Sequence, residues 1–180
     1  MEHIVVEALF EQHIEKTRVL VLDQTGISKL VLHSLNFVGK EIDFYLQNGE
    51  NQDLNQDFFL LEESNFIDTK IFQPTLVFIT REGSLEQYTD LLKGITAGGV
   101  LIYNEKDKVL EQAVDNTDNY FRKITYSQPE ITNGNLKTEL GNIPISNIGD
   151  SQKPYLEGVK LLCQQFGVME EEFYESLMQF

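Results

Sequence analysis

The segment at residues 23–29, DQTGISK, contains residue types found in loops that bind phosphate groups. Such a loop needs glycines that let backbone amides converge, a lysine for the terminal phosphates and a hydroxyl for Mg²⁺. Gly26 and Ser28 stand at suitable positions. Ile27, however, stands where the lysine belongs, and Asp23 stands where the first glycine belongs. The segment therefore has the outline of a phosphate loop without its main cation.

Two further features argue against a triphosphate at this turn. The carboxylate of Asp23 would repel phosphate groups at the mouth of the loop. Lys29 follows Ile27 by two residues, which is about 200° around a helix axis, so it is a poor replacement for the missing lysine. Gln24 and Thr25 add no charge. We interpret the turn as a strand-to-helix connection without a ligand.

Other residues that often carry catalysis or bind metals lack the required spacing. Glu62 and Glu63 are of the type that binds Mg²⁺, but adjacent strand residues point to opposite faces of a sheet. We interpret them as a solvated strand end. Cys163 falls on the apolar face of a predicted helix and has the features of a small core residue. The histidines show no metal-ligand spacing: His3, His13 and His33.

The composition limits the classes of function. The chain has 180 residues with 14 basic and 29 acidic side chains, a formal charge of −15 and a sequence pI near 4.5. Nucleic acids and anionic membranes both call for a basic surface, which this sequence lacks. One cysteine, no signal-peptide pattern and no apolar run long enough to span a bilayer lead us to expect a soluble, cytoplasmic protein.

Short apolar runs alternate with amphipathic stretches, which predicts βαβ crossovers and a mainly parallel α/β sheet covered by helices on both faces. Strands are expected at 18–22, 42–46, 58–62, 75–79, 100–103 and 122–126, with 48–57 as a loop. Helices are expected over 28–38, 84–96, 106–115, 153–166 and 170–178.

A hairpin signal interrupts this alternation. Residues 130–132 and 136–138 flank the turn dipeptide Asn133-Gly134, which is typical of a tight β-turn. Residues 143–145 are expected to add a third short strand. We therefore predict one module over 1–180, with a parallel core at about 1–127 and 148–180 and an antiparallel annex at about 128–147.

Several local phrases resemble the central, ATP-binding domain of the Mur ligases. The most specific one is GGVLIYNEKD at 98–107, which is similar to the family's Gly-Gly-Val-Leu-Ile-Tyr-Asn-x-x-Asp. The resemblance is nearest to the branch of the UDP-N-acetylmuramate–alanine ligase and the muropeptide-recycling (UDP-N-acetylmuramate:tripeptide) ligase. It covers nearly the whole chain and is tighter after residue 97. It implies a six-stranded, mainly parallel sheet, related to the P-loop NTPases, with an antiparallel annex. Further matching phrases stand at 17–19, 73–75, 124–126, 142–145 and 171–175.

The departures from the family pattern bear on catalysis. The family's Gly-x-x-Gly-Lys-Thr corresponds to 23–28, and of its metal-binding Glu-x-Asp-Glu only Glu62 remains. The tract that carries a metal-binding histidine in the family corresponds to 80–83 and contains none. The family's adenine-binding His-Asn-x-x-Asn corresponds to Ser151, Gln152 and, at its end, Tyr155. The N-terminal and C-terminal ligase domains have no counterpart in this sequence.

These departures together lead us to expect a non-catalytic relative that acts by binding, with no catalytic residue, no metal and no cofactor. Its expected partner is an intact Mur ligase or another cell-wall protein. Two alternatives stay open. In the first, the loop still binds a nucleotide or another small anion through Gly26 and Ser28. In the second, the chain is an active ligase with a rebuilt Mg·ATP site or with domains supplied by a partner chain.

Overall fold

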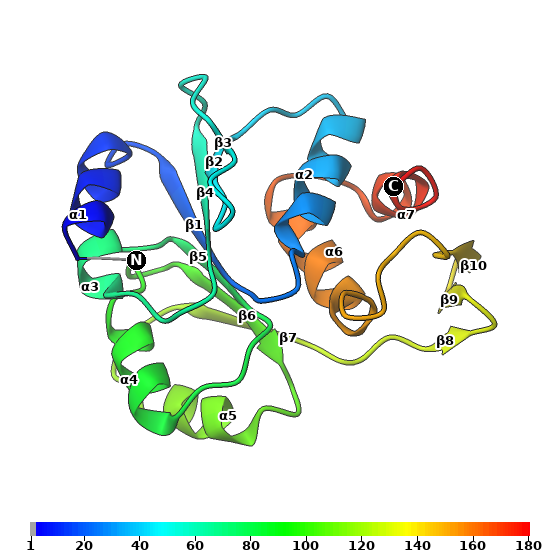
Figure 1. Ribbon diagram of the computed structural model, residues 1–180. Coiled ribbons are helices and arrows are strands. Elements are labelled where there is room, and N and C mark those ends of the chain that lie inside the picture. Colours follow the sequence, from blue (N-terminus) through cyan, green and yellow to red (C-terminus); the bar gives the residue numbers. More distant parts are fainter. Residues whose placement is uncertain (1–2) are drawn as a thin grey trace. The chain divides into compact units, whose positions relative to one another are not determined.

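The apolar run after Thr17 forms β1 (Thr17–Leu22), the central strand of a seven-stranded sheet. It pairs in parallel with β4 (Phe58–Glu63) and with β5 (Leu76–Ile79). Residues 19–22 are fully buried, as expected for an uninterrupted apolar strand in the middle of a parallel sheet. The strand order is β3-β2-β4-β1-β5-β6-β7 (Figure 1).

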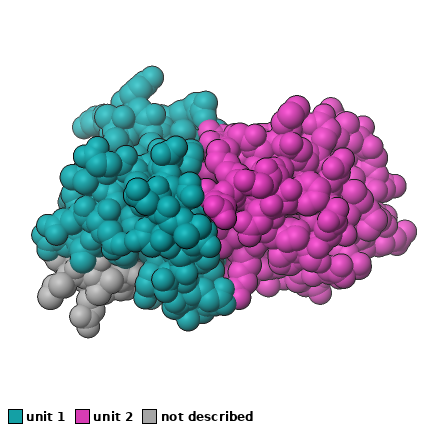
Figure 2. Space-filling model, turned by 90° about the horizontal axis from the view of Figure 1, so that it is seen from above, with its two compact units in different colours: residues 1–24, 42–125 teal, residues 25–41, 126–180 magenta. Residues whose placement is uncertain are grey.

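The computed structural model describes residues 3–180, with side chains from Val6 onward. The chain divides into two compact units (Figure 2). Unit 1 comprises residues 1–24 and 42–125, and unit 2 comprises residues 25–41 and 126–180. The chain therefore leaves unit 1 in the first strand-to-helix turn and returns to it before the second strand.

Unit 1 holds the large sheet, and Figure 1 shows α1, α3, α4 and α5 along one face of it. Alternate strand residues such as Leu20, Leu22 and Phe59 form one core with residues of these helices. The expected mainly parallel α/β fold is confirmed. The remaining elements of this unit are α1 (His3–Gln12), β2 (Asp43–Tyr45), β3 (Asn51–Gln52), α3 (Thr69–Phe72), α4 (Leu85–Lys93), β6 (Val100–Asn104), α5 (Lys108–Asp115) and β7 (Arg122–Tyr126), whose last residue belongs to unit 2.

Unit 2 is built from helices and a small antiparallel sheet. Two buried serines link α2 to α7, because Ser34 Oγ lies 2.8 Å from Ser176 Oγ. Cys163 is fully buried, which confirms its interpretation as a core residue. The elements are α2 (Ser28–Phe37), the 3₁₀ helix η1 (Lys153–Tyr155), α6 (Leu156–Gln165), α7 (Glu170–Leu177) and the strands β8 (Ile131–Thr132), β9 (Asn135–Thr138) and β10 (Gly141–Pro144).

The hairpin turn forms where the sequence predicts it. Asn133 and Gly134 have φ angles of 51° and 74°, the two positive values that a type I′ turn requires. β9 pairs antiparallel with β8 on one side and β10 on the other. The predicted antiparallel annex is therefore present as a three-stranded sheet, while the division of the chain into one module with an annex stays a prediction.

Three differences from the predicted elements have local causes. β3 lies inside the predicted loop 48–57 and adds a seventh strand, antiparallel to β2. The short helix α3 was not predicted, because four residues are too few to show a period. α4 ends at Lys93 rather than Thr96, because Gly94 caps it and presses against Thr69. A Cβ at position 94 would lie 2.1 Å from the carbonyl carbon of Thr69.

Among residues 3–180, no helix has the length and hydropathy needed to cross a bilayer.

His13 is a buried titratable group in unit 1. Its ring stacks on Phe59 with centroids 3.7 Å apart, and its side chain is 3% exposed. Burial lowers the pKa of His13 below 6.5, and the charge of Lys16 lowers it further. The unfolded chain therefore binds a proton at a pH where the folded chain does not, so stability is lost as the pH falls through 6.5.

We expect the free energy of unfolding to fall between pH 7 and pH 5, by at most about 1.4 kcal/mol per pH unit from this group. Urea unfolding of the native protein and of His13→Leu measures the effect, because the variant has no imidazole to protonate. The native protein should lose more stability than the variant over this interval. Equal losses would contradict the assignment.

Candidate functional site

The carboxyl end of β1 places Asp23 at the edge of the sheet in unit 1. Its carboxylate is fully buried and accepts a hydrogen bond from Thr80 Oγ1 at 2.5 Å. Thr80 follows β5, and its backbone amide donates to Leu22 O at 3.0 Å. The residue that the sequence places at the mouth of a phosphate loop is thus bound to the neighbouring strand.

The two glutamates at the end of β4 are both buried: Glu62 is 3% exposed and Glu63 is 6% exposed. Their interpretation as a solvated strand end is therefore wrong, because β4 lies between β1 and β2 rather than at a sheet edge. A carboxylate oxygen of Glu62 accepts from the backbone amide of Gln47 at 3.4 Å. Burial raises the pKa of Glu63, and the charge of Glu62 raises it further.

Arg81 supplies a positive charge at this edge of unit 1. Its guanidinium lies over the ring of Phe66 at 5.1 Å and donates through Nη1 to the backbone carbonyl of Ser64. Gln24 Nε2 also approaches Ser64 O, at 3.5 Å. Arg81 belongs to the tract 80–83, which contains no histidine. Its charge is directed at a backbone carbonyl and an aromatic ring.

The second half of the loop belongs to unit 2. Gly26 has a φ of 73°, a left-handed conformation that glycine adopts without strain, and this turn leads the chain into α2. Ile27, in place of the lysine, has no exposed surface. Ser28 is also fully buried, and its Oγ has no hydrogen-bond partner among residues 3–180.

Gln152 contacts this half of the loop, although it lies more than 120 residues later in the sequence. Its side-chain amide donates to Thr25 O at 3.3 Å and to Gly26 O at 3.2 Å. The loop therefore presents carbonyl oxygens to Gln152, whereas a phosphate loop presents amide N–H groups to its ligand. Acceptors of this kind attract a neutral donor and repel a phosphate oxygen.

The structure brings some of the predicted site residues together and leaves others apart. Within unit 2, Gln152 reaches the loop, whereas Ser151 is exposed and Tyr155 ends η1. Within unit 1, Asp23 and Thr80 meet. Thr80 was not identified from the sequence as a hydrogen-bond partner of Asp23. A threonine directly after a predicted strand is common and gives no sign of such a contact.

No three His, Cys, Asp or Glu side chains within the described part of the chain are arranged to hold a metal ion. The side chain of His3 lies outside the described residues. His13 is buried against Phe59 in unit 1, and in unit 2 His33 Nε2 donates to Ser176 O at 2.9 Å. The histidines for which side chains are described therefore have structural contacts.

No family model and no curated protein matches this sequence. Solved structures do match. A UDP-N-acetylmuramate:L-alanyl-gamma-D-glutamyl-meso-diaminopimelate ligase from Neisseria meningitides is similar over 98% of this chain and 69% of its own, with 13% identity and a TM-score of 0.72. A murein peptide ligase from Psychrobacter arcticus is similar over 97% of this chain and 49% of its own, with 12% identity and a TM-score of 0.73. MurF from Acinetobacter baumannii is similar over 97% of this chain and 48% of its own length, with 14% identity and a TM-score of 0.64.

The fold is that of the Mur-ligase central domain. The apo form of L. casei FPGS shares it, with a TM-score of 0.65 at 10% identity over 97% of this chain. The chain spans about half the length of two of the ligases named above, 49% and 48%. At such identities the similarity establishes the Mur-ligase-like fold and leaves the chemistry to the residues of the site.

Ser28 offers a test of whether the buried hydroxyl in this loop is without a hydrogen-bond partner in the folded protein. A buried hydroxyl without a partner destabilises a fold, so Ser28→Ala should leave the free energy of unfolding unchanged or raise it by about 1 kcal/mol. The matched control is Ser34→Ala in the same helix, whose hydroxyl is bonded to Ser176. It should lower stability by about 1–2 kcal/mol. A loss for Ser28→Ala as large as that of the control, measured by urea unfolding, would contradict the assignment.

Proposed function

We propose that this protein is a non-catalytic Mur-ligase-like module that acts by binding, in peptidoglycan precursor synthesis or recycling. The observation that carries the proposal is the contact of Gln152 with Thr25 O and Gly26 O. The loop that would receive the phosphates is bonded to a neutral side chain of the chain itself. With Ile27 buried in place of the lysine, this half of the loop supplies no cation for a nucleotide.

The electrostatics of unit 1 support the same conclusion. Ligation by this fold implies an acyl phosphate intermediate, whose formation needs positive charge around the transferred phosphoryl group. The end of β1 instead carries the buried carboxylate of Asp23, and of the family's metal-binding acids only Glu62 remains. Loss of one preorganised electrostatic group typically costs about 10²–10³ in rate, so losses in the loop, the metal site and the adenine site together would abolish useful turnover.

The proposed partner is an intact Mur ligase or another protein of cell-wall synthesis, in the cytoplasm where such precursors are made. A surface with a charge of −15 disfavours nucleic acids and anionic membranes, because both carry negative charge. Because this protein shares a fold with the ligases, peptidoglycan precursors and the ligases themselves are the first molecules to test for binding.

Thermal unfolding with and without millimolar Mg·ATP tests the proposal. Ligand at about 100 times its dissociation constant would add about 2.7 kcal/mol of stability, a shift of several degrees for a domain of this size. We expect no shift for this protein and a clear shift for an intact Mur ligase measured as the positive control. A Mg²⁺-dependent shift of the same size in this protein would contradict the proposal and favour a nucleotide-binding or ligase function.

A second candidate function rests on Ser28, whose buried Oγ has no partner among the described residues. It sits in the first turn of α2, where helix amides favour a negative charge. In this alternative the loop binds a small anion in the absence of Mg²⁺. Inorganic phosphate would then raise the melting temperature of the native protein and not that of Ser28→Ala. Equal effects on the two proteins would exclude the loop as the anion site.

A further inference from the structure

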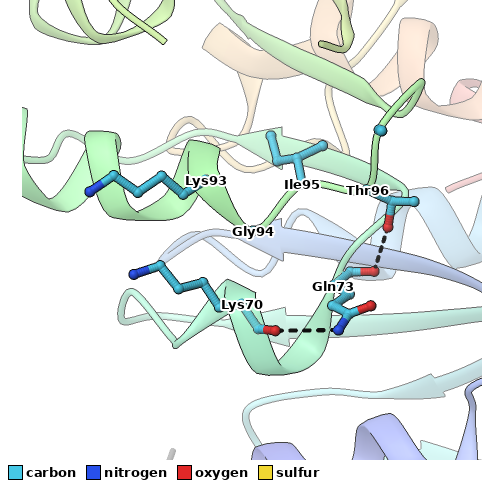
Figure 3. A pocket seen from close by; sticks show the side chains of 7 residues that line it. Lys70, Gln73, Lys93, Gly94, Ile95 and Thr96 are labelled. Carbon is cyan, nitrogen blue, oxygen red and sulfur yellow. Dashed lines mark hydrogen bonds between the residues drawn. The ribbon is translucent and has the colours of Figure 1, made fainter. Parts of the chain in front are cut away.

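A pocket of about 310 Å³ lies in unit 1, away from the loop described above. It opens between the ends of α3 and α4, next to the segments that lead into β5 and β6 (Figure 3). It therefore belongs to the amino ends of these parallel strands, whereas Asp23 and Thr80 stand at the carboxyl ends of β1 and β5. It is lined by Lys70, Gln73, Lys93, Gly94, Ile95, Thr96 and Ala97.

The walls of this pocket are held by close backbone packing. Gly94 approaches Thr69 so closely that no side chain fits between them, and Thr69 Oγ1 donates to Leu91 O at 2.8 Å. Gln73 ends α3 in a left-handed conformation, with a φ of 48°, which is uncommon for a residue with a side chain. Its carbonyl accepts from Thr96 Oγ1 at 3.0 Å. The pocket is thus framed before any ligand enters.

Two lysines from neighbouring helices supply the charge of the pocket. Figure 3 shows the side chains of Lys70 and Lys93 extending to the same side. Lys93 pairs with Asp90 at 2.9 Å, and both side chains are more than half exposed. Lys70 has no carboxylate within ion-pair distance among the described residues. The hydrogen bond and charge of Lys93 lower the pKa of Asp90, and the charge of Lys70 adds a smaller contribution. Both lysines line the same pocket, in a chain with about twice as many acidic as basic side chains.

We propose that this pocket binds an oxyanion of about two negative charges, such as a phosphate group or a small dicarboxylate. Lys70 and Lys93 would bind its oxygens, with Lys93 exchanging Asp90 for the ligand. Gln73 is positioned to add a donor, because its side-chain amide makes only a long 3.4 Å contact with Lys70 O. Asp90 then acts as a competing anion at the rim. The proposal does not depend on the function proposed above, because the two sites share no residue.

The test follows the backbone amide signals of Gly94, Ile95 and Thr96 by NMR while inorganic phosphate or succinate is added at constant ionic strength. Saturable shifts with at least one of these anions, absent with sodium chloride, are expected. Phosphate alone would indicate a phosphate ligand, and succinate alone a dicarboxylate. Shifts that never saturate, or that chloride reproduces, would overturn the proposal.

Substitutions give opposite predictions at the same pocket. Lys70→Met should weaken binding about tenfold, the effect of losing one charged hydrogen bond, while Asp90→Asn should tighten it by removing the competing carboxylate. The matched control is Lys106→Met, an exposed lysine outside the pocket, which should leave the affinity unchanged. Equal losses in the two lysine variants would show a general charge effect and overturn the proposal.

Discussion

Parallel pairing of β1 with β4 on one side and β5 on the other is the constraint on which the candidate site of unit 1 depends. Parallel strands end at the same edge of a sheet, so this pairing brings together the residues that follow each strand. Asp23 meets Thr80 there, and Glu63 stands opposite Leu22 in the register. The same register places the buried residues Asp23 and Glu63 next to each other at this edge, where the backbone amide of Asp23 donates to Glu63 O at 2.9 Å.

The polar residues at this edge bear on whether a protein with this fold can also carry out ligation. Other proteins with this fold are described as ligases, and phosphoryl transfer relies on positive groups around the phosphate. Here the polar groups bind one another or the backbone: Asp23 binds Thr80, Arg81 binds Ser64 O, and Gln152 binds the loop carbonyls. The core of buried strands does not depend on these polar contacts, so the fold by itself does not determine the chemistry of the site.

The elements of the fold were largely predictable, and the contacts of the site were not. β1 and β5 follow from uninterrupted apolar runs, and the hairpin follows from Asn133-Gly134, because local sequence determines both. The burial of Glu62 could not be predicted, because it depends on β4 lying inside the sheet. The contact of Gln152 with Gly26 joins residues 126 positions apart, and no local pattern records such a pairing.

The direct measurement of the central claim is the NMR signal of the Gln152 side-chain amide, assigned with Gln152→Ala and followed during addition of Mg·ATP. The account predicts amide protons that exchange slowly with water, as expected for hydrogen bonds to Thr25 O and Gly26 O, and that keep their positions when Mg·ATP is added. Signals typical of a solvent-exposed glutamine, or signals that move saturably with Mg·ATP, would show that the loop is open to nucleotide and would contradict the account.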